Sequence, residues 1–193
     1  MLLEEEGERL TEEGRRALGR IRAASHRGGR LIEDLLRLSR LSKIDLHVSR
    51  VGLSELASLV ARRIQLLDPG RKVVWVVEPG LDVEADAGLM EEVLEQLLGN
   101  AWKFTSKKEG ARIEFGATER DGKRVFFVRD DGAGFDGAHA AELFGTFHRA
   151  HTDTEFPGLG IGLAIVEKII QKHDGTTWAE GELGKGAAVF FTL

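Results

Sequence analysis

Three glycines alternate with apolar residues in Gly158-Leu159-Gly160-Ile161-Gly162, directly before the apolar run Leu163–Val166. Glycine lets the backbone approach a bulky anion closely, and the N–H groups and dipole of a following helix favour negative charge. The pattern therefore indicates a phosphate-binding loop at a helix N-terminus. A flexible hinge beside a helix is the structural alternative, and it fits the same residues.

Two common nucleotide-binding motifs do not fit this glycine loop. A dinucleotide-binding loop has the spacing GxGxxG directly after a strand, whereas here the spacing is GxGxG and the polar loop 151–155 precedes it. A P-loop has the pattern GxxxxGK[ST]. The one Gly-Lys pair before a small residue is Gly184-Lys185, and Ala179 stands where the first glycine should be. Both motifs are excluded.

The stretch Gln96–Thr105 has helical spacing and carries two polar residues suited to ligand binding. Asn100 lies among apolar neighbours, and its carboxamide oxygen is a suitable ligand for Mg²⁺. Lys103 follows nearly one helical turn later, where it would face phosphates. The structural alternative is a helix-interior amide that bonds local backbone groups.

Two loops carry further groups that could bind parts of a nucleotide. The stretch Asp130–Phe135 follows a predicted strand, so its first carboxylate could accept a hydrogen bond from an exocyclic amine while Gly132 and Gly134 admit a flat base. A plain β-turn is the alternative there. The stretch Phe144–Arg149 ends in an arginine that could neutralise terminal phosphate charge.

The first 42 residues are rich in Glu, Arg, Leu and Ala and contain no proline, which predicts a long helix opened by Thr11-Glu12-Glu13. Leu2–Leu10 is expected to hold the end of another helix and a turn. Apolar residues alternate steps of three and four along one face of the long helix: Ile21, Ala24, Gly28, Leu31, Leu35 and Leu38. One helix cannot bury such a seam alone, so a partner helix or a second copy is expected.

After a connector at Ser42–Gly52 the pattern becomes α/β. Ser54 is the expected N-cap of the next helix, and Asp121-Gly122 is expected to form the turn of a hairpin. The expected helices are Ser54–Leu67, Ala87–Phe104, Ala138–Phe144 and Ile161–His173, and the expected strands are Lys72–Val77, Arg112–Thr118, Lys123–Arg129, Thr176–Glu180 and Gly186–Thr192. Strands grouped with helices on one side predict a two-layer α+β sandwich.

Composition excludes several classes of protein. The net charge of −5 comes from 27 Lys and Arg against 32 Asp and Glu in mixed order, which predicts no nucleic-acid partner. The absence of cysteine excludes disulfides and zinc-thiolate sites. Apolar runs such as Val73–Val77 are too short to cross a bilayer, and the first residues lack the basic region of a secretory signal. A cytoplasmic fragment without membrane contact is expected.

In their order along the chain, the four motif stretches resemble the N, G1, F and G2 boxes of the sensor histidine kinases. The catalytic domain of that family has the ATP-binding fold shared with gyrase and heat-shock chaperone ATPases. The residues Leu98–Thr105 and Trp178–Gly181 are most similar to phytochrome-like and PAS-linked kinases. The resemblance covers nearly the whole chain. It implies that residues 1–45 are the end of the first helix and the second helix of the dimerisation and phosphotransfer hairpin, and that 46–193 are the catalytic domain.

The resemblance also implies the roles of the site residues. It assigns Mg²⁺ to Asn100, phosphate contacts to Lys103 and Arg149, adenine recognition to Asp130, and a mobile ATP lid to about residues 136–157. The positions implied to bind ATP are Asn100, Lys103, Phe104, Asp130, Gly132, Gly134, Phe135, Arg149, Gly158, Leu159, Gly160, Ile161, Gly162 and Leu163.

Several positions depart from the family pattern. Gln96 stands where the family usually has Asn and where the related ATPases have Glu. Further departures are Asp131 for Asn, Thr146 for Pro, Leu159 for Thr and Asp174 for a common Gly. The family's phosphoacceptor is a His followed by an acid on the first hairpin helix. His26 lacks the acidic successor and is expected to be a surface residue, so the acceptor is expected outside this chain. His173, which Asp174 follows, is expected to cap a helix end.

The implied function is the ATP-binding catalytic portion of a two-component sensor histidine kinase, which transfers the γ-phosphoryl group to a histidine elsewhere. The implied partners are ATP, the phosphoacceptor helix, a response regulator receiver domain and a second copy in the full-length protein. An ATPase of the gyrase or chaperone type needs a carboxylate base one turn before Asn100, where Gln96 stands. A non-catalytic nucleotide-binding signalling module is the other alternative.

Overall fold

The computed structural model describes residues 11–148, 156 and 158–193, so the predicted segment Leu2–Leu10 lies outside the described residues. The chain divides into two compact units, residues 1–37 and residues 38–193. The first consists mainly of α2 (Glu12–Leu41), a helix of 30 residues. It begins as the sequence predicts, because Thr11 Oγ1 accepts a hydrogen bond from the Gly14 N–H at 3.1 Å.

The second unit is built on a five-stranded sheet in the order β2-β4-β5-β7-β6. Its strands are β2 (Val73–Val77), β4 (Ala111–Arg120), β5 (Lys123–Asp130), β6 (Thr177–Glu182) and β7 (Gly186–Phe191). The pair β2–β4 is parallel and the other three pairs are antiparallel. The β4–β5 hairpin turns at Asp121-Gly122, where φ is 52° and 72°, as the Asp-Gly pair predicts.

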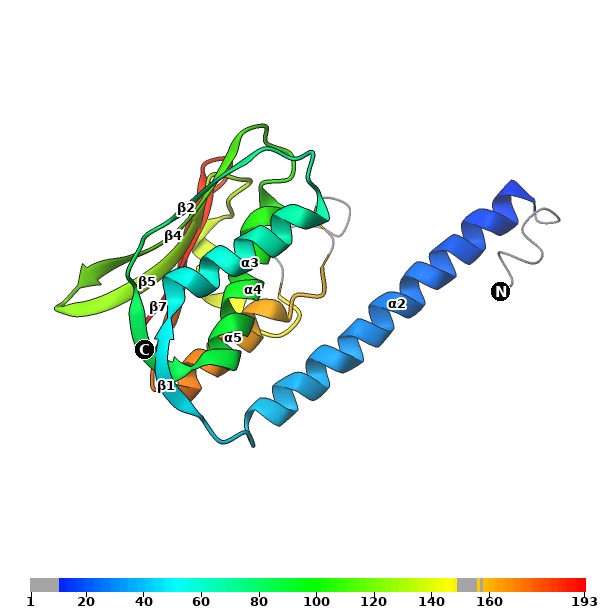
Figure 1. Ribbon diagram of the computed structural model, residues 1–193. Helices are drawn as coiled ribbons and strands as arrows, with labels where there is room; N and C mark the ends of the chain where they lie inside the picture. The colour runs from blue at the N-terminus through cyan, green and yellow to red at the C-terminus, as the bar shows by residue number, and fades with distance from the viewer. Residues whose placement is uncertain (1–10, 149–155, 157) are drawn as a thin grey trace. The chain divides into compact units, whose positions relative to one another are not determined.

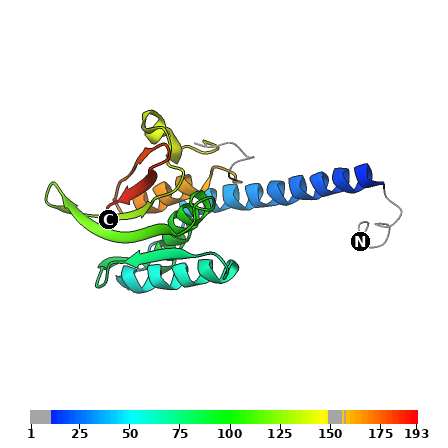
Figure 2. The same ribbon diagram turned by 90° about the horizontal axis from the view of Figure 1, so that it is seen from above.

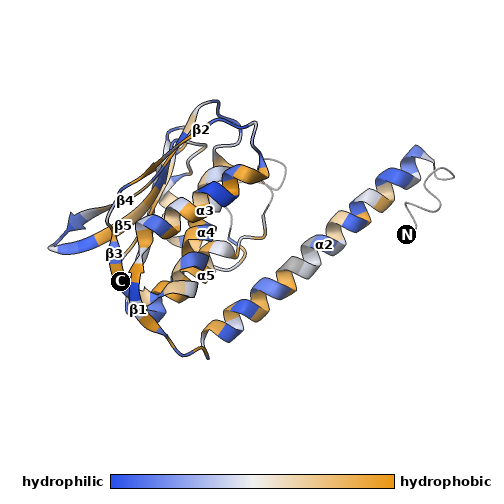
Figure 3. Ribbon diagram, viewed as in Figure 1, coloured by the Kyte–Doolittle hydropathy of each residue, from blue (hydrophilic) through white to orange (hydrophobic). Residues whose placement is uncertain are grey.

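Three helices cover one face of this sheet: α3 (Leu53–Leu67), α4 (Ala87–Phe104) and α5 (Gly162–Lys172) (Figures 1 and 2). Figure 3 shows apolar residues where the helices face the strands. The side chains buried in this core come from both layers and include Met90, Leu94, Leu97, Leu98, Phe115, Ile165 and Phe191. The predicted two-layer α+β sandwich is confirmed, and the bounds of α4 match the expected ones.

A second, two-stranded sheet that the sequence pattern did not predict is formed by β1 (Val48–Gly52) and β3 (Asp82–Asp86). The expected connector Ser42–Gly52 therefore contains a strand. The two strands pair antiparallel, with Val51 opposite Val83. The β1 sequence shows no apolar alternation, and β3 alternates polar and apolar residues over only five positions. Pairing between distant segments also leaves no local signal.

The predicted cap at Ser54 is wrong. The N-cap of α3 is Gly52, and no side chain caps that end. Ser54 is buried instead; its hydroxyl donates to the Glu78 carbonyl at 2.6 Å and accepts from the Leu81 N–H at 2.9 Å. The hydroxyl thus ties α3 to the segment between β2 and β3, a role that a capping pattern cannot distinguish from the cap itself.

Asp86 and His173 join the N-terminus of α4 to the C-terminus of α5. Asp86 is the N-cap of α4 and accepts a hydrogen bond from the Leu89 N–H at 3.1 Å. His173, the C-cap residue of α5, accepts from the Asp86 N–H through Nε2 at 3.1 Å and bonds the Ile169 carbonyl through Nδ1 at 2.8 Å. Both bonds are satisfied together only by the neutral ring with its proton on Nδ1.

The shorter elements complete the second unit. The helix expected at Ala138–Phe144 is a 3-10 helix, η1 (Gly137–Phe144), whose N-cap Asp136 accepts from the Ala138 N–H at 3.0 Å. Among the described residues, no helix combines the length and the apolar character that crossing a membrane requires. His26 on α2 is exposed, as expected.

Candidate functional site

The end of α4 carries three of the predicted site residues. The helix buries Leu97, Leu98 and Ala101, which leaves Asn100, Lys103 and Phe104 half-buried. Because residues three apart share a helix face, Asn100 and Lys103 present a carboxamide and an amine side by side. The apolar positions therefore fix the helix, and the polar positions lie on its less buried side.

The loop after β5 is joined to this helix end by a backbone hydrogen bond. The Ala133 N–H donates to the Phe104 carbonyl at 3.1 Å. A methyl group on Gly132 would lie 2.5 Å from the same carbonyl oxygen, so a side chain there would push the loop away. Gly134 has φ 62°, and a methyl group there would overlap the Glu182 carbonyl. Only glycine fits these two positions.

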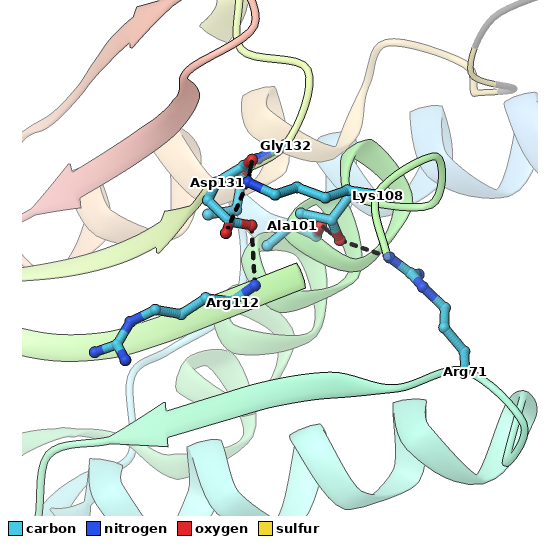
Figure 4. Close-up of polar contacts among 8 residues, drawn as sticks. Arg71, Ala101, Lys108, Arg112, Asp131 and Gly132 are labelled. Carbon is cyan, nitrogen blue, oxygen red and sulfur yellow. Dashed lines mark hydrogen bonds and ion pairs between the residues drawn. The ribbon is translucent and has the colours of Figure 1, made fainter. Parts of the chain in front are cut away.

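Asp131 and Lys108 form a second connection between the same two segments (Figure 4). Lys108 Nζ lies 2.9 Å from Asp131 Oδ2 and donates to the Asp131 carbonyl at 2.9 Å, while Asp131 Oδ1 accepts from the Arg112 N–H at 2.9 Å. Burial acts to raise the pKa of Asp131, but the Arg112 hydrogen bond and the Lys108 charge outweigh it, so the pKa lies below its usual value. The acid that replaces the usual Asn is thus paired.

Asp130, the last residue of β5, has the opposite electrostatic setting. Burial raises its pKa to about 6, and the neighbouring Asp131 charge adds to the rise. Hydrogen bonds from the Gly132 and Ala187 backbone and the charge of Lys108 oppose it, the first through Oδ1 at 2.9 Å. A ligand that donates a hydrogen bond to a poorly solvated carboxylate stabilises its charged form.

The glycine loop also lies close to α4. A methyl group on Gly158 would lie 3.2 Å from Lys103 Nζ, and one on Gly162 would collide with the Gln96 carboxamide. Ile161 is buried at the N-terminus of α5, and Leu163 packs on a cluster that contains Phe135. The loop therefore lies close to Gln96 and Lys103, the polar side chains before and after Asn100 in α4.

Phe156 holds the start of this loop against α4. The ring is 4% exposed and lies edge-on to Phe104, with centroids 5.2 Å apart. Lys107 Nζ lies 4.7 Å from the centre of the Phe156 ring, and Lys103 Nζ lies 4.2 Å from that of Phe104. The amine predicted to meet phosphates is therefore placed on an aromatic face beside the glycine loop.

The structure brings most of the predicted residues together at one end of α4. Three segments meet there: Asn100–Phe104, the loop Asp130–Phe135 and the glycine loop at residues 158–163. Gly132, Gly134 and Phe135 are buried, and the Phe135 ring packs with Phe144 and Ala179, where it supports the loop. Gly158 is exposed, and Leu159, Gly160 and Gly162 are half-buried. Arg149 lies outside the described residues, as does part of the predicted lid.

The described residues contain no group of three His, Asp or Glu side chains placed to hold a metal ion. Asn100 offers one side-chain oxygen at the end of α4, to which phosphate oxygens of a bound ligand could be added. That arrangement suits Mg²⁺, which is commonly bound through substrate phosphates and few protein groups.

Sequence reasoning missed two residues that shape the site, Lys108 and Arg71. Lys108 follows α4 in a polar loop, and its partner Asp131 is 23 positions later. Arg71 lies after the Asp68-Pro69-Gly70 turn and reaches Trp102, 31 positions later. A cation in a turn resembles ordinary surface charge, so the sequence offers no signal for either contact.

The matching family confirms the class of protein. Residues 85–193 match the histidine kinase-, DNA gyrase B- and HSP90-like ATPase family. The match covers more than half of the chain, and the chain belongs to this family. The part that matches is the catalytic ATPase domain of the histidine kinase type.

The relatives include phytochromes and histidine kinases. The chain is 33% identical over 168 residues to cyanobacterial phytochrome A of Nostoc sp. and 35% identical over 165 residues to the methanogenesis regulatory histidine kinase FilI of Methanothrix harundinacea. Each match covers 84% of this chain but only 21% and 18% of the relative. The crystal structure of full-length ShkA in complex with AMPPNP superimposes with a TM-score of 0.70 at 31% identity, covering 94% of this chain and 39% of ShkA.

Proposed function

We propose that this chain binds ATP with Mg²⁺ and supplies the catalytic domain that transfers the γ-phosphoryl group to a histidine outside the chain. The main support is the meeting of three motif segments at one end of α4. The Ala133–Phe104 hydrogen bond joins two of them, and the approach of Gly158 to Lys103 joins the third. The relation to ShkA, whose structure holds an ATP analogue, supports the same ligand.

Asp130 is the proposed adenine-recognition residue. Its Oδ1 accepts from the Gly132 N–H, and a further lone pair of the carboxylate can accept from the exocyclic amine of adenine. The close fit of Gly132 and Gly134 keeps the loop free of side chains that would block a flat base. Recognition at this end would fix the position of the nucleotide before its phosphates are engaged.

The phosphates are proposed to lie between the end of α4 and the start of α5. Lys103 and the N–H groups of the glycine loop offer positive charge there, and Arg149 is proposed to add to it. Asn100 would hold Mg²⁺, which neutralises charge that develops on the phosphate oxygens. Phosphoryl transfer depends mainly on positioning and charge neutralisation, and these residues supply both.

Gln96 favours transfer to a protein group over hydrolysis. It lies one helical turn before Asn100 and close to Gly162, the position where a water-activating base would stand in a hydrolytic ATPase. A carboxamide cannot accept a proton at neutral pH. The nucleophile in our proposal is an imidazole of the phosphotransfer hairpin.

We further propose that residues 1–45 belong to that hairpin and that a second copy pairs with it in the full-length protein. Exposed apolar residues on α2 support a helical partner: Ile21, Ile32, Leu35 and Leu36. The chain spans about a fifth of the length of the curated relatives described above, so the acceptor helix and a response regulator receiver domain are proposed as partners of the whole kinase.

Calorimetry with ATP and Mg²⁺ tests nucleotide binding. We expect binding in the micromolar-to-millimolar range, about −5 to −8 kcal/mol. Asp130→Asn should weaken binding about tenfold, because it removes a charged hydrogen-bond acceptor from adenine. Asp121→Asn in the β4–β5 turn makes the same charge change and should leave affinity as in the parent chain. Equal affinity in the Asp130→Asn variant would refute the assigned role of Asp130.

Transfer is tested by adding labelled ATP and a separate hairpin whose first helix carries the phosphoacceptor His followed by an acid. Label should appear on the added hairpin, and the chain alone should remain unlabelled at His26. Acid-labile label on His26 would contradict an acceptor outside the chain. Binding of ATP without transfer to any hairpin would instead support a non-catalytic signalling module of the same fold.

A further inference from the structure

Arg71 joins the start of β2 to the end of the helix that carries Asn100 and Lys103. Its guanidinium donates two hydrogen bonds, one to the Trp102 carbonyl at 2.6 Å and one to Thr105 Oγ1 at 2.7 Å. The Cζ atom lies 4.0 Å from the centre of the Trp102 ring. Figure 4 shows Arg71 extending from the segment before β2 towards α4.

We propose that Arg71 is a positioning residue for the nucleotide site, which acts by fixing the C-terminal turn of α4 through Trp102 and Thr105. The proposal rests on the nucleotide-binding function proposed above. The hydrogen bonds of the Arg71 guanidinium go to Trp102 and Thr105, which are not among the implied ATP-binding positions. Its effect on a ligand would therefore pass through the helix end.

The end of α4 depends on side chains because no glycine closes it. The C-cap residue is Thr105, at φ −94° and ψ 3°, in place of the left-handed glycine that commonly ends a helix. Thr105 is fully buried, and its hydroxyl donates to the Ala101 carbonyl at 2.6 Å while accepting from Arg71. The last turn of a helix leaves carbonyl groups unpaired, and a guanidinium is suited to binding them.

Arg71 is itself held in place by neighbouring side chains. Trp102 stacks on Trp75 with centroids 5.9 Å apart and planes 8° apart. Gln65 accepts from Trp75 Nε1 at 3.1 Å and donates to the Arg71 carbonyl at 2.8 Å. Burial lowers the pKa of Arg71 despite the opposing charge of Asp68, so the guanidinium gives up solvation to occupy this place. A planar fork that also stacks on a ring is specific to arginine.

The position of the helix end determines the position of the loop on the proposed adenine side of the site. With Arg71 on the Trp102 carbonyl, the Phe104 carbonyl two residues later accepts from the Ala133 N–H. A methyl group on Gly132 would lie only 2.5 Å from that oxygen, so the loop fits closely against the helix. A shift of the last turn by a few tenths of an ångström would therefore move the loop that begins at Asp130.

The test compares Arg71→Met and Arg71→Lys in the full chain with Arg63→Met as the matched control. Arg63 also binds α4, through ion pairs with Glu91 and Glu95, but away from its C-terminus. Amide hydrogen exchange of the nucleotide-free chain is measured at 131–134, with the β1–β3 amides as an internal reference. Calorimetry with ATP and Mg²⁺ is run on the same samples.

Arg71→Met should speed exchange at 131–134 about tenfold, with no change in the β1–β3 amides, and weaken ATP binding about tenfold. Arg71→Lys should recover part of both effects, and Arg63→Met should match the parent chain. Unchanged exchange at 131–134 in Arg71→Met would overturn the proposal. Equal acceleration at 131–134 and in the β1–β3 amides would also overturn it, because it would indicate a merely structural role.

Thr105→Val supplies a second test, because it keeps the volume of the side chain and removes the hydroxyl that binds Arg71. In a double-mutant cycle, Arg71→Met and Thr105→Val should be non-additive in their effect on exchange at 131–134. Additive effects would contradict the proposal that Arg71 and Thr105 act on the loop through their mutual hydrogen bond. If the parent chain failed to bind ATP, the proposed function would fall, whereas the exchange measurements would still decide whether Arg71 holds the loop.

Discussion

The loop after β5 and the glycine loop before α5 both border the end of α4, but different kinds of contact hold them there. The loop after β5 is joined by the backbone bond from Ala133 to Phe104, and Gly132 fits closely beside it. The glycine loop meets α4 through side chains: the Phe156 ring packs on Phe104, and Gly158 approaches the Lys103 amine.

This difference suggests a division of roles. A backbone bond with close steric fit allows one arrangement, whereas a long side chain such as that of Lys103 can change rotamer at low cost. The proposed adenine side is therefore pre-organised, and the proposed phosphate side can adjust to the number of phosphates present. Pre-organisation of one side lowers the ordering cost of the first contact with the nucleotide.

The largest effect is expected from adding a side chain at Gly134, where the neighbouring backbone leaves no room for one. Gly134→Ala places a methyl group on the Glu182 carbonyl and forces a side chain into φ 62°. We expect a loss of about 4 kcal/mol in the free energy of unfolding, measured by urea denaturation.

Gly99→Ala is the matched control. Gly99 lies inside α4 with open space around its missing side chain. The substitution should raise the free energy of unfolding by roughly 0.5 to 1 kcal/mol, because alanine favours the helix. If Gly134→Ala were as stable as the parent chain, the adenine side would not be held as tightly as described.

The second prediction concerns the pH dependence of stability that Asp130 confers. Its folded-state pKa of about 6 is higher than the ordinary value of 3.8, so the folded chain binds the proton more tightly than the unfolded chain does. Its contribution to stability is therefore full below about pH 4 and is lost as pH rises through about 6. The loss corresponds to roughly 3 kcal/mol. Asp130→Asn should remove this pH dependence in denaturation measured from pH 4 to 7.

Nucleotide affinity should depend on pH in the opposite direction. Protonation converts the carboxylate that accepts from adenine into a donor, so ATP binding should be about tenfold weaker at pH 5 than at pH 7. ATP phosphates also titrate in this range, so the Asp130→Asn variant serves as the reference. Identical pH profiles in the parent and variant chains would contradict the role of Asp130.

A smaller effect is expected on the phosphate side. Phe156→Ala removes a buried ring from Phe104 and Lys107, and should lower the free energy of unfolding by about 1 to 2 kcal/mol, less than an interior core substitution. Phe156→Leu should recover part of the loss. Hydrogen exchange at 101–106 should rise in the alanine variant and stay near the parent value at 131–134. Equal acceleration at both places would show that the two sides are not held independently.

The smallest effect is expected from the pair Lys108–Asp131. Both side chains are partly exposed, so Lys108→Met should lower the free energy of unfolding by less than about 1 kcal/mol. The effect should shrink further in 0.5 M salt, whereas that of Gly134→Ala should not. A loss in Lys108→Met that is independent of salt would contradict an electrostatic contribution.

Local patterns were sufficient for the elements that position the site. Helical spacing fixed both bounds of α4, and the Asp-Gly pair located the β4–β5 turn. The order of the four motif stretches identified the histidine kinase resemblance, which the family match confirms. These features depend on neighbouring residues, so they can be read along the chain.

Contacts between distant segments could not be predicted in this way. Ser54 looked like a helix cap but bonds Glu78 and Leu81 across the fold. The β1–β3 sheet joins short strands, and Arg71 meets Trp102 31 positions away. Each depends on which segments the fold brings together, and a charge or hydroxyl in a turn looks the same whether or not it finds a partner.

The central claim is that one ATP with Mg²⁺ binds where α4, the loop after β5 and the glycine loop meet. Hydrogen exchange of the full chain with and without ATP and Mg²⁺ tests this most directly. We predict protection at 100–105, 130–135 and 158–163, together with the predicted lid at 136–157, and no change in the β1–β3 amides. Exchange that is the same with and without nucleotide at all three segments, or protection confined to other parts of the chain, would contradict the claim.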